Sequence, residues 1–146
     1  MQIQGAAISA DAYTISVIGV LALCLLSVLL ATYSGVSKGR AGALSGPVLP
    51  ADDNNRLYRI DRVHMNSVEA LAPFVVPAVL AMIVGVGPII LAVLVWAHVA
   101  IRLIHVTVYL RGGNAAKGGS VRTMLYVSGA LANLVLVVVT GWAAIY

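Results

Sequence analysis

The chain has 146 residues, of which 61% are hydrophobic and only 10% are charged, and its formal net charge is +4. Soluble domains carry about 25% charged residues, so this composition excludes an ordinary soluble protein and indicates a polytopic membrane protein. A membrane span needs about 20 apolar residues, which leaves room for four spans with short loops and none for a separate soluble domain. We therefore expect residues 1–146 to form a single all-α domain, a bundle of four transmembrane helices.

The first apolar tract predicts a span over residues 12–36. Asp11 precedes this tract and Lys38 follows it, which suits the positive amino end and negative carboxyl end of a helix. No basic residue precedes the tract, and it is too long for the apolar core of a signal peptide, so we expect it to stay in the membrane. The single cysteine, Cys24, lies within it and excludes an internal disulfide and any metal site built from several cysteines.

A long loop and a second span follow. The loop contains several Gly and Pro residues, and a loop of this length in so small a protein is often functional. Asp52 and Asp53 are placed to cap the next helix or to support its first turn. We place the second span at residues 57–84, where Pro73 and Pro77 are expected to kink the helix.

The carboxyl-terminal half contains two more spans. The Gly-Val-Gly-Pro sequence at 85–88 predicts a tight turn, which makes the second and third spans antiparallel neighbours. We place the third span at residues 89–110 and the fourth at residues 120–145, with a glycine-rich loop between them. Trp142 and Tyr146 occupy the position expected for an aromatic belt at the membrane interface.

Polar residues in the second span share one helical face. At 3.6 residues per turn, they point to the same side of the helix: Arg59, Arg62, Asn66 and Glu69. Ionisable groups at membrane depth are costly and usually face a bundle interior. Glu69, about 10 Å along the helix from Arg62, therefore requires a cation, for which Arg102 or an arginine of another subunit is the natural candidate. These residues either form an ion pair that fixes helix packing or line a polar pocket that binds an anionic ligand.

The third and fourth spans repeat this arrangement. One stripe along the third span consists of His98, Arg102, His105 and Tyr109, and one face of the fourth carries Arg122, Tyr126 and Asn133. Inserting Arg102 near mid-membrane costs about 2.5–3.5 kcal/mol, so it must be paired or hydrated. The three helices together predict one layer near the cytoplasmic interface, comprising Arg59, Arg62, Asn66, His105, Tyr109, Arg122 and Tyr126, with Glu69 just below. Guanidinium groups bind carboxylates in bidentate fashion, so this layer suits a small anion with two carboxylates.

The basic residues predict the topology. Every Lys and Arg except Arg102 lies in or near the first and third connections, whereas both termini and the second connection contain none. The positive-inside rule then places the basic loops in the cytoplasm and both termini outside. Because topology accounts for the basic charge, we expect no nucleic-acid partner. The alanine- and valine-rich composition favours a bacterial inner membrane.

Several motifs resemble those of a known family. RIDRVHMNSVEALAPF at 59–74 resembles RxxRxHxNxxExxxPF in the second helix of the MAPEG family, the membrane-associated proteins in eicosanoid and glutathione metabolism. RLIHVTVYL at 102–110 is similar to that family's third-helix RxxHxxxYL, and RTMLY at 122–126 to its fourth-helix arginine followed four residues later by tyrosine. SGVSKGRAG at 34–42 is similar to the basic end of its first helix. The chain as a whole resembles a microsomal-type glutathione transferase.

The resemblance implies a homotrimer with active sites between neighbouring subunits, where glutathione binds as co-substrate near the cytoplasmic end and no metal takes part. Carried over by motif, the glutathione-binding residues are Lys38, Arg62, Asn66, Glu69, His105, Tyr109 and Tyr126. Arg122 is the implied catalytic residue, which stabilises a glutathione thiolate that attacks a hydrophobic electrophile dissolved in the bilayer. The implied activity is that of a membrane glutathione transferase or peroxidase with a role in detoxification.

Three other interpretations of these residues stay open. A non-catalytic lipid- or ligand-binding scaffold of the same fold is the nearest, because the family includes members that bind lipid without catalysis and Lys38 stands where the best-known members place Arg. A haem cytochrome is disfavoured, since His98 and His105 lie on one helix and His64 lies off the shared face. A proton-coupled exporter would use Glu69 as its proton carrier, but the surrounding arginines would keep that carboxylate ionised.

Overall fold

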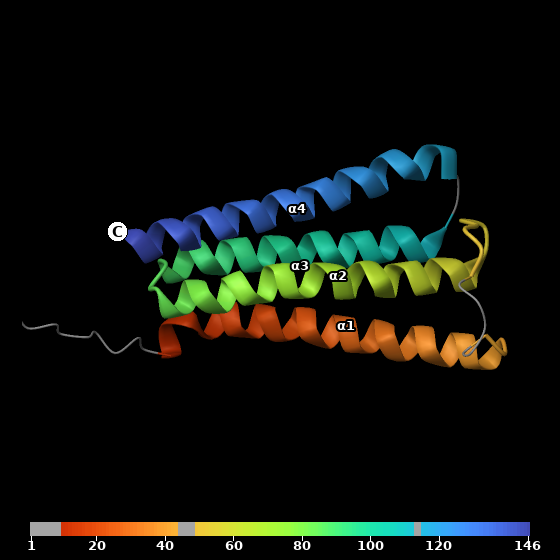
Figure 1. Cartoon of the computed structure of the whole chain (residues 1–146), viewed down its shortest axis with the longest axis horizontal. Helices are drawn as coiled ribbons and strands as arrows, with labels where there is room; N and C mark the ends of the chain where they lie inside the picture. Colours follow the sequence, from red (N-terminus) through yellow and green to blue (C-terminus); the bar gives the residue numbers. More distant parts are fainter. Residues whose placement is uncertain (1–9, 44–48, 113–114) are drawn as a thin grey trace, which may run out of the picture.

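The computed structural model describes residues 10–43, 49–112 and 115–146, and of residues 10 and 115–120 only the backbone. A short 3-10 helix, η1 (Ala10–Tyr13), leads into four long α-helices (Figure 1). These are α1 (Thr14–Arg40), α2 (Arg56–Ile83), α3 (Pro88–Arg111) and α4 (Ala115–Ile145). Each of the four contains a stretch long and apolar enough to cross a membrane. The predicted all-α bundle of a multi-pass membrane protein is thus confirmed.

Two helices extend past the predicted spans at the end of the bundle that carries the basic loops. α1 continues to Arg40, beyond residue 36, and α4 begins at Ala115, ahead of residue 120. Within the described part of α4, Val121–Ile145 is long and apolar enough to cross a membrane. The differences arise because a helical backbone can continue into polar sequence, where hydropathy no longer marks where the helix ends.

The cap of α2 differs from the one expected. Asn55 Oδ1 accepts hydrogen bonds from Leu57 N–H at 2.9 Å and Tyr58 N–H at 3.4 Å, which makes Asn55 the N-cap. The prediction that Asp52 or Asp53 caps this helix is wrong, because a cap residue must directly precede the first helical residue and both aspartates lie upstream of Asn55. The two aspartates are therefore available for contacts outside the helix.

A glycine cap ends α2 and forms the predicted tight turn to α3. Gly85 has a φ of 81°, a conformation that glycine adopts without steric cost, and Val86 N–H donates to Ala81 O at 2.9 Å. This is the Schellman arrangement at a helix carboxyl end. The Tyr13 hydroxyl donates to Val86 O at 2.6 Å, so the start of the chain's helical part is tied to this turn.

α2 passes through Pro73 and Pro77 as one continuous helix. Each proline lacks an N–H and so removes one helical hydrogen bond, which a spanning helix tolerates where neighbouring groups satisfy the backbone. The Thr140 hydroxyl on α4 lies 3.4 Å from the Pro77 carbonyl and 2.7 Å from Leu136 O, in position to donate to either. A polar contact therefore joins α4 to α2 beside the prolines.

Two apolar clusters hold the helices together. The larger consists of Tyr13, Val20, Leu23, Phe74, Ala78, Ala81, Val86, Leu91, Val95, Val99 and Leu136, and the smaller of Leu30, Val63 and Val106. Gly19 lets α1 approach α3 closely, because a Cβ there would collide with the Val95 side chain. In a bilayer such contacts stabilise the bundle through close packing rather than through exclusion of water, since lipid tails are as apolar as leucine.

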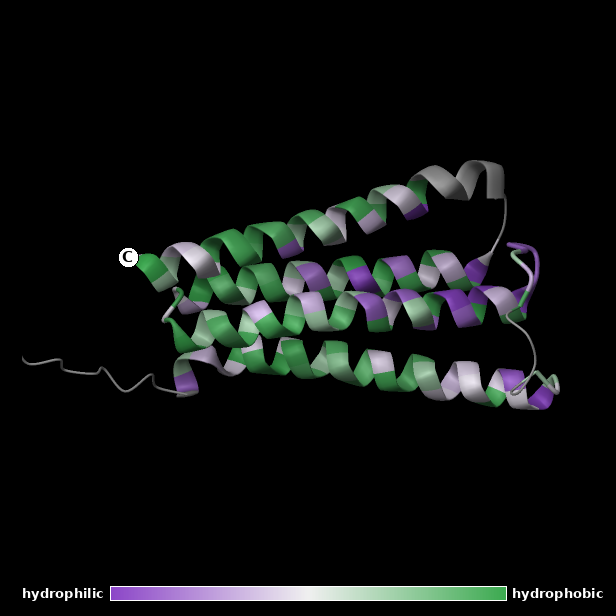
Figure 2. Ribbon diagram, in the orientation of Figure 1, coloured by the Kyte–Doolittle hydropathy of each residue, from purple (hydrophilic) through white to green (hydrophobic). Residues whose placement is uncertain are grey.

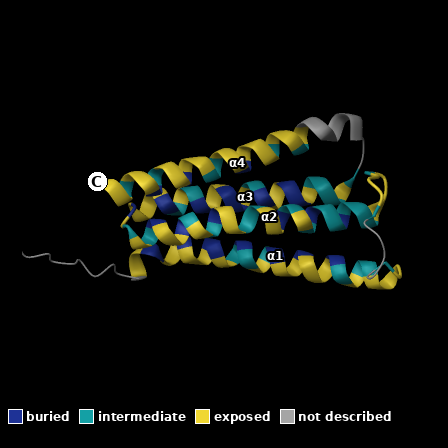
Figure 3. Cartoon of the chain, in the orientation of Figure 1, coloured by how far each residue is buried: buried dark blue, intermediate teal, exposed yellow. Residues whose placement is uncertain are grey.

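The outward surface of the bundle is apolar along its length and polar at one end. Much of α1 and α4 is exposed (Figure 3), and many of the exposed residues are Ile, Leu and Val. Hydrophilic residues gather toward the end that carries the α1–α2 and α3–α4 connections, whereas η1 and the carboxyl end of α4 lie at the other (Figure 2). Arg102 and His105 are buried between helices, only 6% and 2% exposed. A polar site is therefore placed inside the helical bundle.

Candidate functional site

A cavity of about 450 Å³ opens at the polar end of the bundle, between α2, α3, α4 and the loop that precedes α2. This volume lies within the roughly 300–1,000 Å³ of small-molecule sites. Its lining combines two arginines, two carboxylates, an asparagine, a histidine and three hydroxyl groups: Asp53, Arg62, Asn66, Glu69, His105, Tyr109, Arg122, Thr123 and Tyr126. Seven of the eight residues carried over from the family motifs therefore surround one cavity, and Lys38 is the eighth.

Helical periodicity accounts for this convergence. Arg62, Asn66 and Glu69 follow one another at intervals of four and three residues, so α2 presents all three toward the same side. His105 and Tyr109 are one turn apart on α3, and their rings pack at a centroid distance of 5.4 Å. Apart from Asp53, which the loop before α2 supplies, the side chains of the site are held by three helices, an arrangement that positions groups more rigidly than a loop would.

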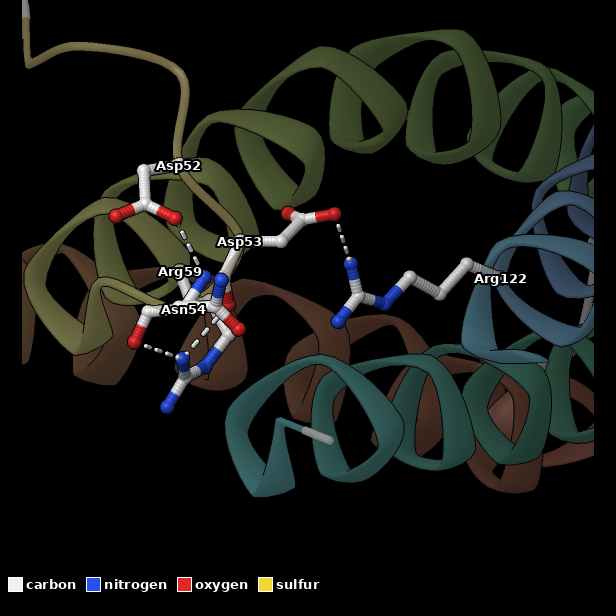
Figure 4. Close-up of polar contacts among 5 residues, drawn as sticks. All are labelled: Asp52, Asp53, Asn54, Arg59 and Arg122. Carbon is white, nitrogen blue, oxygen red and sulfur yellow. Dashed lines mark hydrogen bonds and ion pairs between the residues drawn. The ribbon is translucent and has the colours of Figure 1, made fainter. Parts of the chain in front are cut away.

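Arg122 is the most constrained cation of the cavity. Its Nη1 lies 3.1 Å from Asp53 Oδ2 (Figure 4). Its guanidinium lies 4.4 Å from the centre of the Tyr109 ring. The side chain of Arg122 is only 11% exposed, against 37% for Asp53. Its Nε is buried and has no partner among the described residues. The carboxylate of the loop therefore already occupies one edge of this guanidinium.

Arg59 holds the loop that presents Asp53. Its Nη1 donates to the carbonyls of Asp53 and Asn54 at 2.8 and 2.9 Å, and Asn54 N–H donates to Asp52 Oδ1 at 2.9 Å (Figure 4). Gly112 makes room for this guanidinium, since a Cβ there would lie 2.7 Å from Arg59 Cζ, and its φ of 63° also favours glycine. Arg59 was predicted to belong to the anion-binding layer, but it does not line the cavity and supports the loop instead.

Lys38 lies elsewhere in this chain. It forms an ion pair with Asp61 of α2, whose Oδ1 also accepts a hydrogen bond from the Ser34 hydroxyl at 3.1 Å. Lys38 does not line the 450 Å³ cavity of its own chain. Asp61 was not among the predicted site residues, although a carboxylate near the start of α2, within reach of the basic end of α1, was a signal for this pair.

Arg102 is satisfied by α2 in a way that periodicity did not predict. Its Nη2 donates to the backbone carbonyl of Asn66 at 2.8 Å and to the Ser67 hydroxyl at 3.1 Å. Ser67 in turn donates to Val63 O at 2.9 Å. The expected ion pair between Arg102 and Glu69 is absent from the described part of the chain, because the buried guanidinium finds neutral acceptors on α2 while Glu69 is exposed.

The cavity can pair with a ligand of mixed charge. Among the described residues, the side chains of Arg62, Asn66 and Glu69 make no hydrogen bond or ion pair, so their groups are available. A guanidinium suits a carboxylate, a carboxylate suits an ammonium group, and an amide suits a peptide bond. In the described residues no three His, Cys, Asp or Glu side chains gather as a metal site would require.

Comparison with known proteins identifies the family. The model of the MAPEG family matches residues 13–142, which is most of the chain. No curated protein and no solved structure gives a significant match. The protein belongs to the MAPEG family, and it is a membrane protein of a family concerned with glutathione or eicosanoid metabolism.

Proposed function

We propose that this protein is a membrane-embedded glutathione transferase or peroxidase, which conjugates or oxidises glutathione through its thiolate and acts on hydrophobic electrophiles. The observation that carries the proposal is the gathering of two arginines with Asn66, Glu69 and two tyrosines around one cavity at the polar end of an otherwise apolar bundle. Family membership adds that glutathione is a reasonable ligand class to test first.

The lining matches the groups of glutathione. The tripeptide carries two carboxylates, one ammonium group, two amide bonds and a thiol. Arg62 supplies a bidentate partner for a carboxylate, and Glu69 supplies a partner for the ammonium group. Asn66 can both donate to and accept from an amide bond. With glutathione bound in this way, the guanidinium of Arg62 and the carboxylate of Glu69 would each face a group of opposite charge.

Arg122 is the residue we assign to activation of the thiol. A nearby cation lowers the pKa of a thiol and so raises the fraction of the nucleophilic thiolate near neutral pH. The thiolate would have to share the Arg122 guanidinium with Asp53 or displace that carboxylate. The electrophile would reach the thiolate from the bilayer, because exposed apolar side chains cover the outside of α4.

We further propose that the active unit is a homotrimer and that Lys38 serves the cavity of a neighbouring subunit. Lys38 is held by Asp61 on the α1 side of the bundle, away from the cavity of its own chain. A role in glutathione binding therefore requires that α1 of one subunit pack beside the cavity of the next. The positive-inside rule favours a cytoplasmic location for both basic loops and an external one for both termini. The alanine- and valine-rich composition supports the proposal of a bacterial inner membrane.

A non-catalytic scaffold is the second candidate, and the Asp53–Arg122 ion pair is the observation that favours it. An arginine whose charge is already neutralised by a carboxylate at 3.1 Å stabilises a thiolate less than a free one. Such a protein would bind glutathione or a lipid in the same cavity without lowering the pKa of a bound thiol.

Titration of the purified protein with glutathione separates the two candidates. The enzyme proposal expects thiolate absorbance that saturates with glutathione and turnover of an apolar electrophile, whereas the scaffold expects binding with neither. Arg122→Ala should abolish thiolate absorbance and turnover while the oligomer persists. Arg111→Ala, which removes an exposed arginine at the end of α3, is the matched control and should change neither. Normal turnover by Arg122→Ala would refute the assigned role.

A further inference from the structure

A second, deeper cavity adjoins the proposed glutathione site. It has a volume of about 230 Å³ and lies between α2, α3 and α4. The two cavities share Asn66, Glu69 and Tyr126, but the deeper one is also lined by Arg102 and Asn133, which do not reach the first. It lies within the membrane-spanning part of the bundle, so its ligand would come from the bilayer.

Several polar groups on the wall of the deeper cavity are left without partners in the described part of the chain. Arg102 uses only Nη2 for its bonds to α2, so its Nε–H and Nη1–H groups are available. Asn133 Oδ1 and His98 Nδ1 are buried and accept or donate no hydrogen bond. Glu69, which also lines the cavity but lies on an exposed side of α2, forms no ion pair among the described residues. Unsatisfied polar groups in an apolar interior are destabilising, so an occupant that pairs with them is expected.

The wall combines the opposite charges of Arg102 and Glu69. A lone anion or a lone cation would meet one attractive and one repulsive group there, whereas an uncharged polar group can hydrogen-bond to both. Arg102 offers N–H donors, while Glu69 and the Asn133 amide oxygen offer acceptors, so the occupant must both accept and donate a hydrogen bond. A hydroxyl-type O–H does both, whereas a ketone, ether or epoxide oxygen only accepts.

The remaining wall is small and apolar. Ala70 and Pro73 of α2 face Gly129 and Ala130 of α4 across the cavity. Gly129 lines the cavity, and a Cβ there would lie 3.8 Å from Ile101 and 3.9 Å from His98, which is ordinary contact, so a side chain can be introduced at this position. The absence of side chains beyond a methyl group at three of these positions leaves space for an alkyl chain next to the polar wall.

We propose that the deeper cavity binds the hydroxyl end of a bilayer-dissolved amphiphile, an alcohol-type molecule whose O–H donates to Glu69 or Asn133 and whose oxygen accepts from Arg102. The binding requires no thiol, so it can be measured without glutathione and stands apart from the proposed catalytic activity. The bound hydroxyl would lie beside the glutathione cavity, because both cavities share Asn66, Glu69 and Tyr126.

Photolabelling of the full chain in lipid nanodiscs tests this site. The probe is 1-decanol carrying a photoreactive group in its chain, and the labelled residues are identified by mass spectrometry without glutathione. Labelling should saturate, should map to α2 and α4 around the cavity, and should be competed by 1-decanol but not by decyl methyl ether or decanoate. Uniform labelling of lipid-facing residues, or equal competition by the ether, would overturn the proposal, as would a cavity that holds only water and is not labelled.

Variants provide the second measurement. Gly129→Leu should fill the cavity and abolish its labelling. Gly141→Leu, on the same helix at a position where a Cβ meets no atom of the described residues within 4 Å, should leave the labelling intact. Asn133→Leu removes an amide partner and should weaken competition by 1-decanol about tenfold, as expected for loss of a buried hydrogen bond. Unchanged labelling in a folded Gly129→Leu protein would overturn the site, and unchanged competition by 1-decanol in a folded Asn133→Leu protein would overturn the role of Asn133 as a partner of the hydroxyl. Glutathione binding, measured in a separate experiment, tests the proposed glutathione-dependent function and not this site.

Discussion

Replacing Asp53 with asparagine tests whether the loop before α2 competes with a ligand for Arg122. The two side chains are joined at 3.1 Å, with 37% of Asp53 and 11% of Arg122 exposed. After screening by solvent, a pair this exposed on one side contributes on the order of 0.5–1 kcal/mol. A glutathione thiolate that displaces Asp53 gives up this contribution, so Asp53→Asn should strengthen thiolate binding by about two- to fivefold. Asparagine keeps the size of the side chain, which limits other effects.

The assay is the absorbance of bound thiolate as a function of glutathione concentration, at low and high salt. S-methylglutathione has the same carboxylates but no thiol, so the gain in affinity should be absent or smaller for it. Asp52→Asn is the matched control, because Asp52 lies beside Asp53 and contacts Asn54 rather than Arg122. Weaker thiolate binding in Asp53→Asn would mean that the carboxylate orients Arg122 for the ligand, and the competition argument would be wrong.

Three further predictions concern packing, the buried arginine and the subunit contact. Gly19→Leu should destabilise the detergent-purified protein by about 1–3 kcal/mol in thermal unfolding because its Cβ collides with α3, whereas Gly35→Leu, with no atom near its Cβ, should be nearly neutral. Ser67→Ala removes one hydrogen bond to the buried guanidinium of α3 and should cost about 1 kcal/mol in the same assay; an unchanged midpoint would show that this bond is replaced. Lys38→Ala should weaken glutathione binding if Lys38 serves a neighbouring subunit, whereas Asp61→Ala should not; equal effects of the two variants would indicate a purely structural ion pair.

The number of helices and the residues that share a face were predictable because both depend on local properties of the chain. Four apolar tracts of spanning length can satisfy their backbone in a bilayer only as helices. The period of 3.6 residues then determines that Arg62, Asn66 and Glu69 point the same way, and that His105 and Tyr109 do so on α3. The cavity lining follows these faces closely.

The ends of helices were less predictable, because polar sequence outside the membrane can be helical or not. The cap of α2 is Asn55, although Asp52 and Asp53 are equally good capping residues by type. Their position relative to the first helical residue decides the matter, and the pattern of apolar residues locates that residue only to within a few positions.

Which side chains meet across helices was decided only by the tertiary structure. The sequence by itself determined four spans and the polar face of each, since these depend on residue type and spacing within one helix. It did not determine that Arg102 bonds to the α2 backbone and Ser67 rather than to Glu69, or that Asp53 pairs with Arg122. Such contacts depend on the rotation and axial shift of one helix against another. A small rotation, or a shift of a few ångströms, is enough to exchange one polar partner for another.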